Sequence, residues 1–302
     1  MFRTLLSPVD GSPASEHALP MALAIAARAK ATLHVALVHV PDAFGDTAAA
    51  HWADFDAEGK SHEETYLASL RRRLREVSES SIEVHHLEGI VEETLIGEVA
   101  QRNVDLVVIS AHGWGYVSRA VMGSVSDYLM RHLPVPLLVV HAPPDASQNL
   151  ARPVAVRRVL VPLDGSPLAE SILPPARALG QLWQAEYRLL RVVAPPGSFW
   201  SWQSDAEAGK PHDRQSAAHD AATTYLDALA ERLRHESLTV ETSVQVAHNP
   251  AKAILDEAQA AACDLIAIAT HGRGGLNRLL WGSVADKVIR GAATPVLVRS
   301  SS

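Results

Sequence analysis

Two kinds of loop in this chain combine residue types that could hold a phosphorylated ligand. The tripeptide Asp-Gly-Ser begins at Asp10 and again at Asp164, each time directly after a short apolar run. Two glycine-rich segments, residues 110–125 and 269–284, both end in Gly-Ser-Val. A carboxylate can accept hydrogen bonds from sugar hydroxyls, glycine allows close approach of the backbone, and the free N–H groups at a helix start attract anions. The segments are not Walker loops, because no Gly-Lys-Ser/Thr follows.

Both loops occur twice because the chain contains two copies of one sequence unit. Asp10 and Asp164 are 154 residues apart, whereas Asp105 and Asp264, which open two matching apolar runs, are 159 residues apart. The change in spacing places about five extra residues in the first long loop of the second copy. So long a period indicates tandem duplication of a whole domain. We expect domains at residues 1–142 and 157–302, joined by a linker at 143–156 that begins with Pro143 and Pro144.

Each copy alternates candidate strands and helices. In the first copy, apolar and β-branched runs predict strands at residues 4–9, 32–40, 82–87, 106–109 and 137–140. Helices are expected at 13–29, with Ser12 as cap and Pro13 in first position, and at 63–78 and 92–102. Near-continuous apolar strands separated by helices indicate a parallel sheet covered on both faces. Right-handed crossovers then predict an open, doubly wound α/β fold, in which ligands bind at the carboxyl ends of the strands.

The glycine-rich segments resemble the universal stress protein family, in particular its ATP-binding branch. The family pattern is Gly, two residues, Gly, nine residues, then Gly-Ser or Gly-Thr. The second copy has Gly272, nine residues and Gly282, with Ala269 in place of the first glycine. The first copy has Gly113, nine residues and Gly123, with Ser110 in place of the first glycine. The resemblance covers nearly the whole chain and implies two tandem open-sheet domains of the adenine nucleotide alpha hydrolase-like fold, with mostly parallel five-stranded sheets.

The resemblance also implies a ligand, ATP, which would bring Mg²⁺ with it. An aspartate would lie at the ribose and adenine end, the backbone of a valine would read adenine, and the glycine-rich segment would hold the phosphates with glycines free to adopt positive φ. The matching residues of the second copy are Asp164, Val192, Gly272, Arg273, Gly275, Gly282, Ser283 and Val284. Those of the first copy are Asp10, Val40, Gly113, Gly123, Ser124 and Val125. Two alternatives stay open: that each aspartate is only an Asx-turn residue that caps the next helix, and that each glycine segment is a turn with a capped helix and no ligand.

The two copies differ inside the glycine-rich segment. The second copy carries Arg273 and Gly275 where the first has Trp114 and Tyr116. An arginine can pair with phosphate oxygens through a planar fork of donors, whereas the two rings add bulk beside a charged ligand. We therefore expect the second copy to bind ATP more tightly than the first, and the first copy could be empty.

The sequence pattern assigns no chemical role to the histidines. His112 and His271 precede the glycine turns without an acidic neighbour and are interpreted as hydrogen-bonded turn residues. His85 and His86 lack the spacing of three or four residues that a helical metal site would need. No catalytic residue and no metal ligand is therefore assigned.

Composition narrows the function classes further. The chain has 302 residues, 47% hydrophobic and 20% charged, and a net charge of −7, which disfavours non-specific nucleic-acid binding. Its one cysteine, Cys263, excludes an intrachain disulfide and a cysteine zinc cluster and fits a reducing cytosol. No secretory leader and no membrane-length apolar run is expected. These features predict a cytoplasmic protein.

The main hypothesis is an ATP-binding stress-response regulator or sensor with at most slow hydrolysis, because no clear general base accompanies the arginines of the glycine segment. The alternative is a nucleotide-independent adaptor that works through an unknown protein partner. An adenylating enzyme is the weakest reading, since no Ser-Gly-Gly-type loop follows the first strand. The apolar segments 136–140 and 295–298 are edge strands that need pairing. The resemblance implies that they pair with each other in an intrachain pseudo-dimer, and a further homodimer is left open.

Overall fold

The computed structural model describes residues 2–41, 49–111, 123–141, 149–195, 211–271 and 283–301. The chain divides into two compact units, Met1–Val154 and Ala155–Ser302. The division falls within the predicted linker 143–156, of which residues 143–148 lie outside the described residues. The exact domain bounds stay a prediction. No helix among the described residues is both long and apolar enough to cross a membrane.

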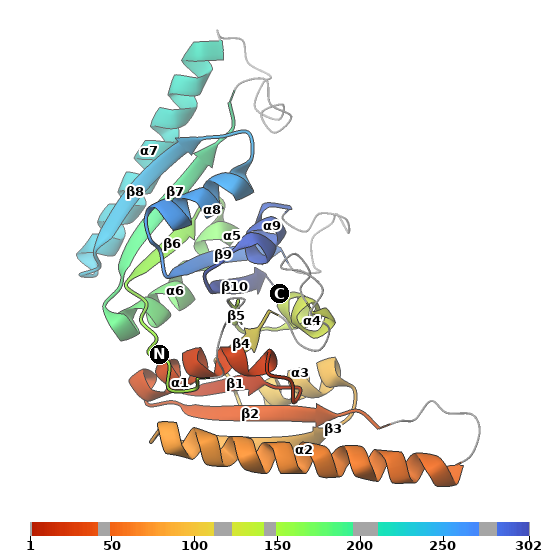
Figure 1. Ribbon diagram of the computed structural model, residues 1–302. Coiled ribbons are helices and arrows are strands. Elements are labelled where there is room, and N and C mark those ends of the chain that lie inside the picture. Colours follow the sequence, from red (N-terminus) through yellow and green to blue (C-terminus); the bar gives the residue numbers. More distant parts are fainter. Residues whose placement is uncertain are drawn as a thin grey trace. The chain divides into compact units, whose positions relative to one another are not determined.

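Unit 1 is a five-stranded sheet with helices between the strands (Figure 1). Its strands are β1 (Thr4–Pro8), β2 (Thr32–His39), β3 (Ile82–Glu88), β4 (Leu106–Ser110) and β5 (Leu137–Val140). Its helices are η1 (Ser15–Ala18), α1 (Leu19–Ala29), α2 (Ala49–Val77), α3 (Val91–Gln101) and α4 (Ser124–His132). The strand order is β3-β2-β1-β4-β5, and these neighbours pair in parallel.

Unit 2 repeats this plan. Its strands are β6 (Arg158–Pro162), β7 (Glu186–Val193), β8 (Val240–Val246), β9 (Leu265–His271) and β10 (Val296–Ser301), in the order β10-β9-β6-β7-β8 with parallel pairing. Its helices are α5 (Pro167–Glu170), α6 (Leu173–Gly180), η2 (Gln181–Trp183), α7 (Pro211–His235), α8 (Pro250–Ala260) and α9 (Ser283–Gly291). The predicted tandem, doubly wound α/β fold is confirmed.

The central strands explain why the sheets are covered on both faces. Consecutive residues of β4, from Leu106 to Val108, are fully buried, and so are those of β6 from Val159 to Val161. Because successive side chains of a strand point to opposite faces, continuous burial requires helices on both sides.

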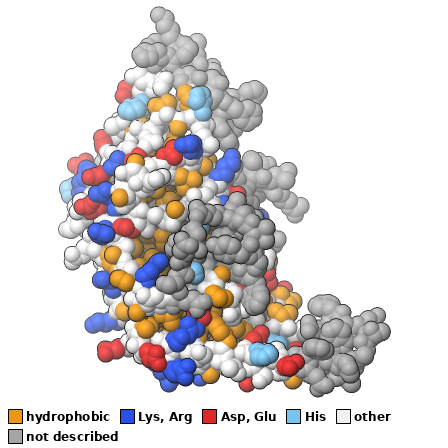
Figure 2. Space-filling model, in the orientation of Figure 1, with side chains coloured by type: hydrophobic (Ala, Val, Ile, Leu, Met, Phe, Trp, Pro, Cys, Tyr) orange, Lys and Arg blue, Asp and Glu red, His pale blue; other side chains and the backbone are white. Residues whose placement is uncertain are grey.

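On the face visible in Figure 2, basic and acidic side chains are interspersed, without one large patch of a single sign.

Two helices of unit 1 differ from the sequence prediction. The first was expected from residue 13, but α1 begins at Leu19 after a turn and a single 3₁₀ segment. In that turn the Ser15 amide donates to the Ser12 hydroxyl at 3.2 Å, and the Ser15 hydroxyl donates to the Ser12 carbonyl at 2.8 Å. Such local bonds compete with helical ones. In unit 2, Ser166 instead caps α5 directly, with Pro167 in first position as expected.

The second helix starts earlier than predicted, at Ala49 rather than at Glu63. Its first half carries no regular apolar stripe, and therefore the sequence showed no helical periodicity there. Polar contacts from Asp56 and Lys60 to the ends of β2 and β3 hold part of this half in place. Figure 1 shows α2 running along β3.

Candidate functional site

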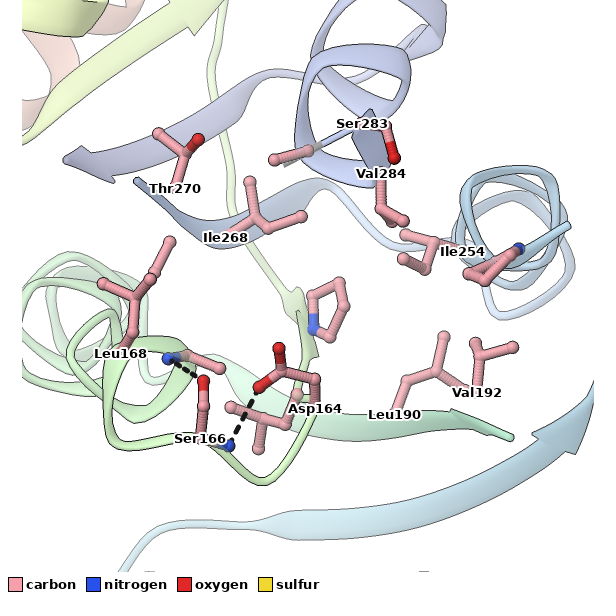
Figure 3. A pocket seen from close by; sticks show the side chains of 16 residues that line it. Asp164, Ser166, Leu168, Leu190, Val192, Ile254, Ile268, Thr270, Ser283 and Val284 are labelled. Atoms are coloured by element: carbon pink, nitrogen blue, oxygen red, sulfur yellow. Dashed lines mark hydrogen bonds between the residues drawn. The ribbon is translucent and has the colours of Figure 1, made fainter. Parts of the chain in front are cut away.

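A cavity of about 360 Å³ opens at the carboxyl ends of the unit 2 strands. The strands β6, β7 and β9 supply one part of its wall, and α8 and α9 supply another (Figure 3). Most of the lining is apolar, including Leu190, Val192, Ile254, Ile268 and Val284. This size and lining suit a small molecule with a flat apolar portion.

The turn after β6 brings a carboxylate to this cavity. The Ser166 amide donates to Asp164 Oδ1 at 2.9 Å, and the Ala169 amide donates to the Ser166 hydroxyl at 3.1 Å (Figure 3). Between them, Gly165 has φ +81°, a left-handed conformation that favours glycine. Asp164 therefore caps its own turn, as one of the alternatives predicted, and also lines the cavity. The turn bond uses one carboxylate oxygen, Oδ1.

A helix begins at the same cavity. Ser283 and Val284, the first two residues of α9, both line it, so N–H groups of the first helical turn, which have no partner within the helix, lie nearby. Helix N-termini attract anions through these groups and through the helix dipole. Thr270, at the end of β9, adds a hydroxyl that is 2% exposed and has no hydrogen-bond partner among the described residues.

Unit 1 has a corresponding cavity of about 320 Å³. The Ser12 amide donates to Asp10 Oδ1 at 2.9 Å, and Gly11 has φ +81°, so the turn repeats that of unit 2. Ser124 and Val125 open α4 and line the cavity. Ser110 is 4% exposed at its wall, and its hydroxyl has no hydrogen-bond partner among the described residues.

The glycine before α4 is not required by its backbone conformation. Gly123 has φ −61° and ψ 151°, which any residue can adopt. The glycines of the second copy for which positive φ is expected lie outside the described residues. Among the described residues, a Cβ at this position would meet nothing closer than the Ala111 carbonyl oxygen at 4.0 Å. The glycine thus leaves open space at the cavity wall, in front of the helix start.

Comparison with known proteins agrees with this geometry. The sequence profile of the universal stress protein family matches residues 1–141 and again residues 155–299. The chain belongs to the universal stress protein family.

Similar relatives and structures carry the same family name. Universal stress protein Rv1996 of Mycobacterium tuberculosis H37Rv is 28% identical over 311 residues, covering 96% of this chain and 92% of that protein. A universal stress protein of Mycolicibacterium smegmatis is 30% identical over 210 residues, which is 66% of this chain and only 63% of that protein's length. The crystal structure of a universal stress protein from Archaeoglobus fulgidus DSM 4304 has a TM-score of 0.71 at 21% identity and covers 98% of both chains, which shows the fold.

Some candidate residues of this universal stress protein line the two cavities, and others lie outside the described residues. The cavities bring together Asp164, Val192, Ser283 and Val284 in unit 2, and Asp10, Gly123, Ser124 and Val125 in unit 1. Five further candidates lie outside the described residues, namely Gly113, Gly272, Arg273, Gly275 and Gly282. The same holds for Trp114 and Tyr116, so the predicted difference between the glycine segments stays a prediction.

Val40 requires a correction. It lies just beyond the end of β2, is 52% exposed and does not line the cavity of unit 1. The register of the strands pairs Val38 with Leu87 and Val192 with Gln245 at corresponding points of the two units. Val38 is therefore the counterpart of Val192, and it does line the cavity. The register pairs Pro8 with Ala36 and Pro162 with Leu190, so the structural counterpart of Val192 lies two residues before Val40.

Sequence reasoning missed a polar cluster at the wall of the unit 1 cavity. Glu63, from α2, lines that cavity, and its Oε2 lies 2.9 Å from Nδ1 of His39 and 2.7 Å from Nε2 of His86. The other ring nitrogen of His39, Nε2, lies 2.9 Å from Asp56 Oδ1. Burial opposes protonation of His39, but the hydrogen bonds to Asp56 and Glu63 outweigh it and raise the pKa of His39.

The signal for this cluster lay in strand spacing rather than helix spacing. Neighbouring residues of a strand point to opposite faces, so His85 and His86 of β3 were never candidates for one site. His86 instead shares its face with His39 of the adjacent strand, because the register pairs His86 with Leu37. The spacing of three or four residues that is typical of helical metal sites does not detect ligands that come from two adjacent strands.

Proposed function

We propose that this universal stress protein binds an adenine nucleotide, ATP with Mg²⁺, at the carboxyl ends of its strands, and that it acts as a stress-response sensor or regulator. The observation that carries the proposal is the coincidence, in each unit, of a mainly apolar cavity, an aspartate turn, a helix start and a buried hydroxyl without a partner. A nucleotide could contact all four features at once through its base, its ribose and its phosphates.

The apolar wall supports a base-binding role. In unit 2, Leu190, Val192 and Ile254 converge on the part of the cavity beside Asp164 (Figure 3). A planar base would exclude water from these side chains, and burial of apolar surface stabilises by about 25 cal/mol per Å². Asp164, at the same wall, is placed to accept hydrogen bonds from ribose hydroxyls through the oxygen that the turn does not use.

The polar end of each cavity supports a phosphate-binding role. The starts of α4 and α9 present N–H groups there, beside the open space that Gly123 leaves in unit 1. A buried polar group without a hydrogen bond costs about 1–3 kcal/mol. The hydroxyls of Ser110 and Thr270 would recover such a cost by bonding a ligand at the cavity wall.

The lining also supports a sensor rather than an efficient ATPase. Asp164 is the one titratable side chain among the described residues that line the unit 2 cavity, and its turn holds it in place. In unit 1, Glu63 is occupied by two histidines. Rapid phosphoryl transfer needs a residue that positions the nucleophile and cations that stabilise the transition state. We therefore expect any hydrolysis to be slow.

Two measurements test the proposal on the full chain. Purified protein is denatured gently, and the released small molecules are analysed by mass spectrometry; we expect ATP or ADP. Calorimetric titration of nucleotide-free protein with MgATP should then show saturable binding, which the double variant Gly123→Val/Gly282→Val abolishes while circular dichroism shows an intact fold. Absence of both released nucleotide and saturable binding would refute the proposal and favour the nucleotide-independent adaptor. Light scattering separately tests whether the chain forms a homodimer, which the sequence leaves open.

A further inference from the structure

Three side chains from separate elements of unit 1 bring possible metal ligands together. We call His39, Glu63 and His86 the β2–β3–α2 cluster. They come from the end of β2, from α2 and from β3, and one ligand atom of each lies within 4.8 Å of the other two. The shared atom is Glu63 Oε2, at 2.9 Å from His39 Nδ1 and 2.7 Å from His86 Nε2. His39 is buried, and Glu63 and His86 are partly buried.

The cluster has the supporting contact that metal-bound histidines usually have. His39 directs Nδ1 at the centre of the cluster, while its opposite nitrogen, Nε2, lies 2.9 Å from Asp56 Oδ1. A carboxylate behind a ligating histidine orients the ring and selects the tautomer. Nearby, Lys60 is directed to Glu88 at 3.0 Å, at the outer edge of the cluster. Lys60 Nζ also lies 3.8 Å from Asp56 Oδ2, so it contacts the carboxylate behind His39.

We propose that the β2–β3–α2 cluster binds a divalent transition-metal ion of the Zn²⁺ class. His39 Nδ1, His86 Nε2 and one Glu63 oxygen are the ligands, and Asp56 positions His39. Two imidazoles and a carboxylate suit such an ion, whose bonds to nitrogen and oxygen are about 2.0–2.2 Å long. Tetrahedral ligands at that bond length stand about 3.4 Å apart, so the Glu63 oxygen needs to move about 0.5–0.7 Å away from the two histidine nitrogens.

The proposed ion would lie beside the unit 1 cavity. Glu63 lines the unit 1 cavity as well as belonging to the cluster. An ion held there would neutralise the carboxylate at the cavity wall and fix α2 against the ends of β2 and β3. The position left open by three protein ligands could take water or a ligand atom from the cavity.

Unit 2 shows that the fold does not need these polar groups. Strands β2–β3 and β7–β8 pair in corresponding registers, so His39 corresponds to Val193 and His86 to Val244. Glu63 corresponds to Ala222, because each lies three residues before the tyrosine of matching Tyr-Leu segments in α2 and α7. Apolar residues thus serve the same places in the second sheet, and burying polar groups instead is costly unless they are paired. Packing alone therefore does not explain why unit 1 has polar residues at these three positions.

A second histidine cluster in unit 1 is a weaker candidate for a metal. His34, Glu83 and His85 lie on the opposite face of the β2–β3 pair, with stacked imidazole rings 5.1 Å apart between centroids. His34 Nδ1 lies 2.9 Å from His85 Nε2, so the two nitrogens satisfy each other. Arg102 stands 3.9 Å from Glu83, and its positive charge opposes a cation. His85 therefore provides a matched control position beside His86.

The test uses the full chain without a histidine tag. Zn²⁺ binding is measured by calorimetry in competition with a chelator, and Co²⁺ binding by visible absorption, which responds to the coordination geometry. We expect one strong site per chain. The variants His86→Val and Glu63→Ala, which copy unit 2, should each weaken Zn²⁺ binding by at least about tenfold. His85→Ser, which copies Ser243, should leave it unchanged.

Stability supplies an independent readout. Zn²⁺ should raise the melting temperature of the wild type and of His85→Ser, because a ligand that binds only the folded state stabilises it. It should not raise that of His86→Val. Absence of Zn²⁺ and Co²⁺ binding by the wild type would overturn the proposal, as would unchanged affinity in both folded cluster variants, or loss of binding in His85→Ser alone. None of these measurements uses a nucleotide, so failure of the proposed function would leave their result intact.

Discussion

The two units share a backbone plan but differ in the chemistry around their cavities. Both have the same turn after the first strand, with an aspartate that caps it and a glycine at φ +81°. In unit 1 the neighbouring wall is polar, through Glu63 and the histidines that hold it. In unit 2 the matching positions are apolar. The turn is common because backbone geometry demands it, whereas the long helix and the outer strands tolerate either chemistry.

A second contrast concerns how each long helix is anchored. In unit 1, Glu16 is 4% exposed and accepts two hydrogen bonds from the guanidinium of Arg73, at 2.7 and 2.8 Å. In unit 2, the matching Glu170 accepts one bond from Arg232 and one from the Tyr225 hydroxyl, each at 3.0 Å. The Arg232 side chain is 64% exposed. The glutamate of this ion pair is thus buried in unit 1, where the Arg73 side chain is 31% exposed, and partly exposed in unit 2.

The largest effect should come from breaking these ion pairs. Arg73→Met leaves the buried Glu16 carboxylate without its partner, and loss of one partner of a buried pair costs about 3 kcal/mol of stability. Arg232→Met removes an exposed pair, which contributes less than about 1 kcal/mol. Hydrogen exchange followed by mass spectrometry measures the opening free energy of each unit separately. Equal effects of the two substitutions would show that burial does not distinguish the pairs.

The next effect ranks the two nucleotide sites. If unit 2 binds ATP more tightly, Gly282→Val should remove the stronger phase of a calorimetric titration, with an affinity loss of at least about tenfold, or 1.4 kcal/mol. Gly123→Val should remove only a weaker phase. Arg273, for which the first copy has Trp114, favours this order because a guanidinium can pair with phosphate oxygens. If Gly123→Val alone abolishes binding, the order of the two sites is reversed.

A smaller effect separates the two roles of the aspartate turn. Asp164→Asn keeps an oxygen that can accept the Ser166 amide but removes the charge, whereas Asp164→Ala removes both. We expect Asp164→Ala to weaken ATP binding by about tenfold, as for loss of a hydrogen bond to a charged group. Asp164→Asn should weaken it less and preserve the melting temperature. Should Asp164→Ala lower stability and leave ATP affinity unchanged, the aspartate would be a turn residue alone.

The smallest effect compares the turn glycines. Gly11→Ala and Gly165→Ala both force a side chain into the left-handed region, which costs about 1 kcal/mol. A Cβ at Gly11 meets no atom of the described residues within 4 Å, whereas one at Gly165 lies 2.8 Å from Nη1 of Arg191. Because that atom ends a flexible side chain, Gly165→Ala should be only slightly more destabilising. Denaturation midpoints measure the difference, and a stabilising Gly11→Ala would contradict the backbone argument.

Much of the architecture could be predicted from the sequence because its signals are local. The duplicated Asp-Gly-Ser turns, the apolar strands and the helix starts at Ser124 and Ser283 each depend on residues a few positions apart. The start of α2 could not be predicted in this way, since its first half lacks an apolar stripe and is held by Asp56 and Lys60. Val38, not Val40, corresponds to Val192 for a related reason. The register of a strand depends on its pairing with another strand, which residues a few positions apart in the sequence do not reveal.

What the sequence determined by itself was the repeat, the doubly wound fold and the aspartate turns, because covalent spacing and side-chain type settle these within one segment. The tertiary structure alone decided that His39, Glu63 and His86 meet. Their meeting depends on the register of β2 against β3 and on which side of α2 faces the sheet. Both are set by the burial of whole apolar faces, a property of many residues together that no single spacing in the sequence reveals.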